Sequence, residues 1–462
     1  MKRLFFLLAL TIGCGLQAAA QKQIYIPEDL RGMDLESDTS QWSFRRSVET
    51  RDLIFMWERG FGNDLQSPPQ LDGHPMAFNL SVLTDRVQRF YDFFRDSLEF
   101  IKNGECRVEN DKNVEWRVEN VEFATATPSS TKGTAAANST LYTLHSTLDT
   151  TLHSTQPSKA DRYKMMVMVM YSLDGTAYGG TYDDTIGALW VAPNRIQDRT
   201  MNCMAHELGH SFQSQIVADG QGEAWGGTGF FEMASQWMLW QVNPWWLRDE
   251  NYHFEAFRQL THKAFLHLEN IYHSPYVLQW WADLHGRGVI AELFRQGRRG
   301  EDPVMTYQRM HGLTQSQFCD EMLQGYQHLV NLDFRHAHQE TRPYACTWQT
   351  PLDTLRGGWL RPQNVPEAYG FNIIPLPADR RLSVQVKGQN LRWALVGITP
   401  DGRSVYGQPQ DARLKSKEPL SRLFLVVMGA PTRHRQLRMP TEHQPDPAGE
   451  PERFPYTFRI RH

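Results

Sequence analysis

Long hydrophobic runs are absent from this 462-residue sequence after residue 20. A membrane-spanning helix needs roughly 18 or more consecutive apolar residues, and no later stretch approaches that length, so no transmembrane segment is expected. An excess of positive charge is also absent, because the formal net charge is −4. Such a chain has no electrostatic attraction to nucleic acid or to an anionic membrane surface, and neither is expected as a partner.

Cysteine is scarce as well. Five cysteines occur, and the four after residue 20 lack the C-x-x-C spacing of a zinc knuckle. Four cysteines allow three disulfide pairings, which a sequence cannot rank. Buried free thiols are an equal alternative, because a chain of this size does not need disulfides for stability. The four residues are Cys106, Cys203, Cys319 and Cys346.

The first 20 residues have the three-part pattern of a secretory signal. Two basic residues precede an apolar run over 4–16, and three small residues end at Ala20. We therefore expect cleavage near Ala20 and a mature chain that begins at Gln21, secreted, periplasmic or at the cell surface. A lipoprotein attached through Cys14 is the less favoured alternative, because Thr11 stands where such signals usually have leucine.

The next part of the chain divides into a folded segment and an insertion. Residues 21–106 contain the strand-like DLIFMW and a helical pattern over 84–101, with Thr84 as the expected cap. Residues 107–160 are rich in Ser and Thr, and RVEN and LHST each occur twice there. A low-complexity insertion that is mostly disordered is expected from this composition.

Residues 161–462 predict an α+β fold. Strand-like runs cover 165–171 and 186–191, joined by a Gly-rich connection, and a helical pattern then continues to about residue 334. Residues 341–462 change to short strands with alternating apolar and polar positions. That spacing of strands predicts a C-terminal β-sandwich.

The motif that carries chemistry lies in CMAHELGHSFQSQ, residues 203–215. His206 and His210 are four positions apart, so they project from the same side of a helix. Both can place a ring nitrogen about 2.0–2.1 Å from one zinc ion. Glu207 points about 100° around the axis, so it is not a competing ligand and can accept a proton from an attacking water. The motif predicts a Zn²⁺ site with Glu207 as the catalytic base.

The helix that carries the motif should have a buried side. It is expected to begin after a cap at Asp198 or Thr200 and to end near Ala218. Five apolar positions form a stripe offset from the two histidines, which is typical of a helix packed on a core. They are Met201, Met204, Leu208, Phe212 and Ile216.

A third ligand is expected, because a catalytic zinc usually has three protein ligands and one open position. The metzincin pattern is excluded, because it needs a glycine and a histidine where this chain has Gln213 and Ile216. Glu232 lies on a second helix, expected over about 228–243, among large apolar residues that would make an unpaired carboxylate costly. Glu223 is the alternative, but it lies in a Gly-rich loop, and fixed ligands belong on rigid elements.

Residues 203–240 carry a resemblance to a known class. HELGH followed by a helical glutamate at this distance resembles the gluzincin class of zinc metallopeptidases. HELGHSFQ followed by W-G-G-T-G-x-x-E, which ends at Glu232, is similar to enhancin-like, mucin-targeting peptidases. After the glutamate that pattern has Asn residues, and this chain has Ser235 and Gln236. Over residues 41–460 the chain also resembles a family of secreted bacterial proteins of unassigned function, some labelled avirulence-like.

The resemblance implies a fold and further site residues. It implies a zincin-like catalytic domain over 161–340, with 21–106 as its N-terminal part and 341–462 as an accessory domain. The zincin arrangement also implies a strand that pairs with an extended substrate, for which TIGALWVAP, just before the motif helix, is the candidate. A transition-state donor is expected too, and Tyr272 or His273 is preferred by role. The alternatives in NIYHSPY and NYHF are Tyr276, Tyr252 and His253.

Three functions from different classes fit the sequence. The first is a secreted zinc-dependent endopeptidase that hydrolyses proteins or glycoproteins. The second is a protein- or glycan-binding module on a zincin scaffold that no longer turns over substrate, although the presence of Glu207 argues against it. The third is a helix with structural histidines and no metal, which would require His206, His210 and Glu232 to meet by accident.

Overall fold

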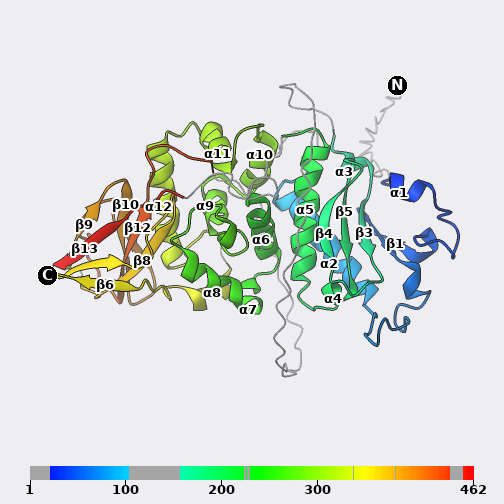
Figure 1. Ribbon diagram of the computed structural model, residues 1–462, viewed down its shortest axis with the longest axis horizontal. Coiled ribbons are helices and arrows are strands. Elements are labelled where there is room, and N and C mark those ends of the chain that lie inside the picture. Colours follow the sequence, from blue (N-terminus) through cyan, green and yellow to red (C-terminus); the bar gives the residue numbers. More distant parts are fainter. Residues whose placement is uncertain are drawn as a thin grey trace, which may run out of the picture.

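The computed structural model describes residues 21–102, 157–222, 225, 229–336, 338–379, 381–436 and 451–461. The described chain is a mixed α+β fold, as predicted. It is elongated, with a five-stranded sheet at one end, helices in the middle and two four-stranded sheets at the other end (Figure 1). Among the described residues, no helix is long and apolar enough to span a bilayer.

Several predicted features lie outside the described residues. They are the signal segment 1–20 with Cys14, residues 107–156 of the insertion, Cys106, and the alternative ligand Glu223. The last residues of the predicted insertion belong to the folded chain, because Ser158 is buried and caps the short helix α3 (Lys159–Arg162).

The five-stranded sheet has the order β1-β2-β3-β5-β4. Its three central strands are parallel neighbours, and each edge strand is antiparallel to the strand beside it. β2 and β3 are buried at every position, which explains why their sequences are continuous apolar runs without alternation. The strands are β1 (Ser47–Glu49), β2 (Leu53–Trp57), β3 (Met165–Val169), β4 (Ala177–Tyr182) and β5 (Ile186–Val191).

The edge strand beside α5 is β4, so TIGALWVAP, the candidate for a strand that pairs with an extended substrate, has no free edge. The strand in TIGALWVAP is β5, which lies inside the sheet between β3 and β4. β4 lies in the segment predicted to be only a connection, because Gly179 and Gly180 weaken its strand signal. Gly179 is required by packing: a Cβ there would lie 1.8 Å from the backbone oxygen of Glu207.

The helix that carries the HELGH motif is α5 (Asn202–Ala218), and it lies along β4 and β5. It ends where predicted, but the predicted caps were wrong. Met201 is the N-cap residue, with a left-handed φ of 50° and no capping side chain. The Asp198 carboxylate accepts hydrogen bonds from the backbone and hydroxyl of Thr200, which form a local turn before the helix.

The helix expected over 84–101 is shorter and starts earlier. α2 (Leu80–Asp92) is capped by the Asn79 side chain, which accepts from the backbone of Val82. Thr84 lies inside the helix, and its hydroxyl donates to the carbonyl of Ser81. The helix then widens into a π-helical segment, Phe93–Ser97.

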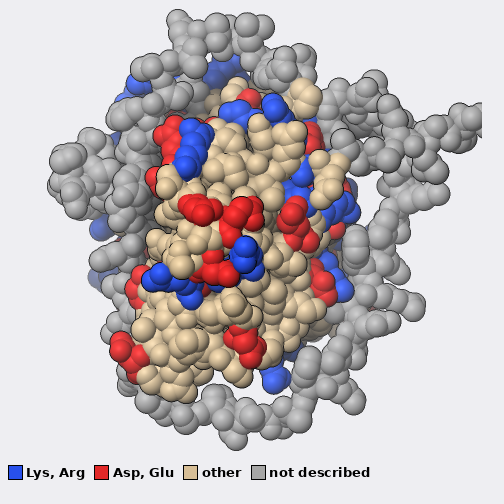
Figure 2. Space-filling view, turned by 90° about the vertical axis from the view of Figure 1, so that its right-hand side faces the viewer, with Lys and Arg blue, Asp and Glu red and all other residues tan. Residues whose placement is uncertain are grey.

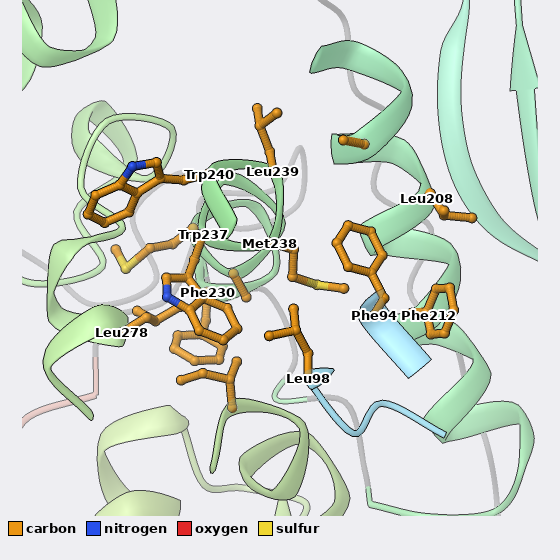
Figure 3. Packing of buried hydrophobic residues seen from close by; sticks show 14 of the residues in the cluster. Phe94, Leu98, Leu208, Phe212, Phe230, Trp237, Met238, Leu239, Trp240 and Leu278 are labelled. Carbon is orange, nitrogen blue, oxygen red and sulfur yellow. The ribbon is translucent and has the colours of Figure 1, made fainter. Parts of the chain in front are cut away.

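A core of large apolar side chains joins α5 to α6 (Phe230–Val242). Figure 3 shows Met238 extending from α6 toward Phe94 and α5, while Trp240 and Leu278 lie on the far side of α6. The two helices approach closely at Gly209, where a Cβ would lie 2.4 Å from the hydroxyl of Ser235. All five residues of the predicted apolar stripe on α5 are buried.

The helices that follow α6 in the chain lie around it and between it and the C-terminal sheets (Figure 1). Short helices α1 (Glu28–Arg31) and α4 (Pro193–Ile196) lie beside the first sheet. The others are α7 (Trp246–Asp249), α8 (Asn251–Leu260), α9 (Tyr276–His285), α10 (Val289–Gln296), α11 (Pro303–His311) and α12 (Gln315–Val330).

The C-terminal part contains two antiparallel four-stranded sheets, with orders β11-β10-β12-β8 and β6-β7-β13-β9. The first contains β8 (Phe371–Leu376), β10 (Leu391–Ile398), β11 (Ser404–Tyr406) and β12 (Arg422–Gly429). The second contains β6 (Leu352–Leu355), β7 (Trp359–Pro362), β9 (Ser383–Gly388) and β13 (Tyr456–Arg461).

The β12 strand shows how these sheets are attached to the rest of the molecule. Val426 and Met428 belong to the large core that includes the helices, and α12 packs against β10 and β12. Leu425 and Val427 face the other way, into a second cluster shared with β9 and β13. The first C-terminal sheet is therefore covered on both faces. The hydrophobic core continues across residue 340, the predicted boundary between the catalytic and accessory domains.

The surface at the N-terminal end carries charges of both signs. Figure 2 shows Asp and Glu interspersed with Lys and Arg among other residues of the described chain on this face. The whole sequence is also nearly balanced, with 48 basic and 52 acidic residues. A strong single-sign field is therefore not a feature of this described face.

Candidate metal centre

Three side chains predicted as ligands meet between α5 and α6. His206 Nε2 and His210 Nε2 are 3.0 Å apart, and each lies 3.1 Å from Glu232 Oε2. These three residues are the single group of three or more potential metal ligands within the described residues. Their side chains are 12–15% exposed, so the cluster lies just below the surface.

The helices place these atoms for simple geometric reasons. His206 and His210 are one turn apart on α5, and Glu232 lies in the first turn of α6. The close approach at Gly209 brings α6 against α5. The Ser235 hydroxyl donates to the backbone oxygen of His206 at 2.6 Å, which fixes the two helices to each other beside the cluster.

Two glutamines determine which nitrogen of each histidine faces the cluster. His206 Nδ1 is 3.1 Å from Gln236 Oε1, and His210 Nδ1 is 3.0 Å from Gln213 Oε1. An amide oxygen can only accept, so each Nδ1 must donate its hydrogen. The amide orientations are fixed in turn, because Gln213 Nε2 donates to the Phe231 carbonyl at 3.0 Å. In the neutral form of each ring, the Nε2 lone pair therefore faces Glu232.

The hydrogen-bond chain continues beyond Gln236. Its Nε2 donates to the Tyr272 carbonyl at 3.0 Å and to His253 Nε2 at 3.2 Å. His253 Nε2 therefore accepts, so the neutral ring carries its hydrogen on Nδ1, which is 2.7 Å from His273 Nδ1. His273 must then accept at Nδ1 and carry its hydrogen on Nε2. The chain links His206 to His273 through three defined hydrogen bonds.

Electrostatics show that the cluster favours positive charge. Burial alone would lower the pKa of His210, but the neighbouring Glu232 outweighs it, with help from Glu207, and raises the pKa of His210 to about 9. Burial would raise the pKa of Glu232, but the two imidazoles hold the pKa of that carboxyl far below its usual range. When both rings are neutral, three hydrogen-bond acceptors converge here, and a proton or a metal cation relieves their mutual repulsion.

Glu207 lies on α5 between the two histidines. Its charge contributes to the raised pKa of His210. Among the described residues no side chain or backbone group donates a hydrogen bond to the Glu207 carboxylate, whereas two imidazoles contact the Glu232 carboxylate. Its backbone oxygen is the atom that approaches Gly179 of β4. Glu207 therefore stands between the cluster and the edge strand.

The structure separates the predicted donors into two groups. The Tyr272 ring stacks near His206, with ring centroids 6.1 Å apart, and His273 is linked to the cluster through His253. Tyr276 is fully buried among aromatic rings of the core, and burial holds its pKa well above its usual value. Tyr252 is 63% exposed on α8 beside His253. Tyr272, His253 and His273 are thus near the cluster, and His253 lies between the cluster and His273 in the hydrogen-bond chain.

Sequence reasoning missed the residues that orient the histidines. Gln213 lies three positions after His210, and Gln236 lies four positions after Glu232, so both spacings place them on the helix side that faces the cluster. Buried glutamines in two apolar helices were the available signal, because a buried amide needs partners. Gln236 contacts the His206 ring, and its neighbour Ser235 donates to the His206 backbone oxygen.

The cysteines have no role in this cluster. Cys203, Cys319 and Cys346 are free thiols within the described chain. Burial raises the pKa of the Cys203 thiol to about 12, so it is protonated at neutral pH.

Comparison with known proteins gives one match. No curated protein and no solved structure matches the chain. A family described as a family of unknown function (DUF6055) matches over residues 16–139 and 134–462. The match agrees with the expected resemblance to a family without assigned function, and the description of the family names no activity. Because the two matched segments span nearly the whole sequence, the chain belongs to the DUF6055 family of unknown function.

Proposed function

We propose that this protein is an exported, zinc-dependent peptidase of the HExxH type, with a zincin-like catalytic unit and a C-terminal β-sandwich. The observation that carries the proposal is the convergence of three lone-pair donors, His206 Nε2, His210 Nε2 and Glu232 Oε2, within 3.1 Å of one another. Both Nδ1 atoms are occupied by glutamine oxygens, so the ligand nitrogens are already oriented.

The donor set fits zinc. Two imidazole nitrogens and one carboxylate oxygen form a ligand set found in catalytic zinc sites, which keep an open position. Four atoms arranged tetrahedrally at 2.0–2.1 Å from a zinc ion are about 3.3–3.4 Å apart, close to the separations of 3.0 and 3.1 Å seen here. When bound, zinc supplies a Lewis acid that polarises a carbonyl and makes water a stronger acid.

Glu207 supplies the proton transfer in this proposal. It accepts a proton from water as the water attacks the peptide carbonyl carbon, and it returns the proton to the leaving nitrogen. The described contacts support the role, because no donor neutralises its carboxylate and its backbone lies against β4. Tyr272 and His273 are proposed as donors to the developing oxyanion.

The β4 edge supplies a binding surface for an extended substrate. The backbone N–H of Ala192 donates to the carbonyl of Thr176 across the β4–β5 pair. In an antiparallel ladder every second residue bonds the partner strand, so the backbone groups of residues 178, 180 and 182 also point toward β5. The backbone groups of residues 177, 179 and 181 then point to the open edge. Gly179 lies directly beside α5 at Glu207 and His210, so a peptide paired there passes the metal centre.

The test measures metal and hydrolysis in the same preparations. Purified full-length protein should contain about one zinc per chain, and His206→Ala or His210→Ala should remove most of it. Plain proteins and mucin-type glycoproteins are then incubated with and without a chelator. Glu207→Gln should keep the zinc and lose hydrolysis by roughly a hundredfold or more, the scale of a general base.

A matched control is Glu255→Gln, because Glu255 is an exposed α8 glutamate paired with Arg258. It should keep both zinc and hydrolysis. Full zinc content in both histidine variants would exclude the proposed ligands. Tightly bound zinc without cleavage of any substrate would exclude the peptidase and favour a binding protein on this scaffold.

A further inference from the structure

A small polar pocket lies at the C-terminal end of the molecule, far from the metal centre. It has a volume of about 230 Å³ and lies where β9 of one sheet and β10 of the other separate. Figure 1 places β9 and β10 at the C-terminal end of the long axis, separated from β4 and α5 by the helices in the middle. The pocket is therefore independent of the proposed catalytic site.

The pocket is lined by one flat aromatic side chain and two amides. Trp393 is half-buried and packs against the cluster between the two sheets. Asn390 and Gln410 add side-chain amides, and neither amide has a hydrogen-bond partner among the described residues. An indole offers a large rigid apolar face with a polar edge, and each amide offers two donors and one acceptor.

The backbone holds both amide residues in an unusual conformation. Asn390 and Gln410 have left-handed φ values of 52° and 63°. Two hydrogen bonds fix them: Gln410 N donates to the Trp393 carbonyl, and Ala430 N donates to the Asn390 carbonyl, both at 2.8 Å. A left-handed conformation is uncommon for glutamine, and residues held in such regions concentrate at binding sites.

The lining carries no unpaired charge in the described structure. Arg392 is the one ionisable residue of the lining, and its guanidinium donates to Asp320 at 2.6 Å and to Ser316 at 2.8 Å. A charged ligand would therefore find no free counter-charge here. A neutral ligand with several hydroxyl groups matches the two amides, because each hydroxyl both donates and accepts.

We propose that this pocket binds a neutral sugar ring, with one ring face on Trp393 and its hydroxyls on the amides of Asn390 and Gln410. The volume of about 230 Å³ equals that of about eight water molecules at roughly 30 Å³ each, which suits a single six-membered ring. A ligand of that size binds weakly, with a Kd of roughly 1–10 mM.

The test uses the full-length chain and measures binding without hydrolysis. Methyl glycosides of glucose, galactose, mannose and the N-acetylhexosamines are added at up to tens of millimolar, with chelator present. Saturation-transfer NMR should detect at least one of them. Sialic acid, adenosine and a short neutral peptide are tested in the same way.

The variants remove the amides without straining the backbone. Asn390→Gly and Gln410→Gly both tolerate positive φ, so the double variant should keep its thermal midpoint and weaken sugar binding at least tenfold. Trp393→Leu keeps an apolar side chain toward the core and should also abolish binding. The matched control is Asp72→Gly, an exposed left-handed position in the N-terminal part, which should bind like the parent.

Three results would overturn the proposal. They are the absence of binding to every neutral sugar, unchanged binding in the double glycine variant, and binding of only the charged, nucleoside or peptide probes. Because zinc is removed throughout, none of these results depends on whether the metal centre is catalytic.

Discussion

Replacing Gly179 by alanine should disconnect the edge strand from the metal centre. A Cβ at this position would lie 1.8 Å from the backbone oxygen of Glu207 and 2.9 Å from the Cβ of His210. Ordinary contact begins at 3.4 Å, so β4 and α5 must separate by about 1.6 Å, the difference between those two values. Neither neighbouring atom can move alone, because one is helix backbone and the other is fixed to it.

The magnitude follows from that displacement. Overpacking of this kind costs about 1–3 kcal/mol of folding free energy. Displacement of a substrate-binding strand by about 1 Å costs roughly a hundredfold in rate. The zinc ligands lie on α5 and α6, which the new methyl group does not separate, so metal content should persist. Gly179→Ala should therefore hold zinc, unfold at a lower temperature, and hydrolyse peptides roughly a hundredfold more slowly.

The adjacent glycine provides the control. The atoms nearest to a Cβ at Gly180 belong to the Tyr178 side chain, at 3.1 Å, and that side chain is 47% exposed and can move outward. Gly180→Ala should match the parent in melting temperature, zinc content and hydrolysis. The reasoning is refuted if Gly179→Ala retains full stability and activity, or if the two alanine variants are equally impaired.

Three further predictions concern the hydrogen bonds around the centre. Gln236→Leu should weaken zinc affinity by about 10–100-fold in a competition titration, and Gln236→Glu should restore part of it. The control is Gln279→Leu, because Gln279 is buried and remote from the ligands, and this variant should leave zinc affinity unchanged. An equal loss of zinc affinity in Gln236→Leu and Gln279→Leu would mean that only packing matters. Burial is the main cause, and the charge of His273 the second, that lowers the pKa of His253 from 6.5 to about 3. Between these two pH values the unfolded chain therefore binds a proton at His253 that the folded chain does not bind. This group should therefore lower the free energy of unfolding by about 1.4 kcal/mol per pH unit as the pH drops from 6.5 toward 3. Urea titrations of His253→Asn should lack this contribution to the pH dependence. An identical pH dependence in the parent and the variant would contradict the prediction. Tyr272→Phe should lower kcat more than it raises KM if the hydroxyl stabilises the transition state, and a change in KM alone would assign it to substrate binding.

The sequence contained most of the local information about the centre. Helical spacing alone put His206 and His210 on one side of a helix, and the apolar surroundings of Glu232 indicated that its charge needs a partner. The buried stripe on α5 and the fully buried β2 and β3 were also predictable, because their patterns depend only on neighbouring residues. The starts of the helices were less predictable, because the N-cap residues of α2 and α5, Asn79 and Met201, depend on the geometry of the turns that precede them.

Only the tertiary structure decided how distant segments meet. Gly179 and Gly180 look like a connection in sequence, yet β4 is the open edge, because absence of a Cβ lets it lie against α5. Gln213 and Gln236 look like ordinary helix residues until α5 and α6 come together and their amides fix the two imidazoles. A sequence records periodicity along each segment, whereas the orientation of ligand lone pairs depends on packing between segments that are far apart in the chain.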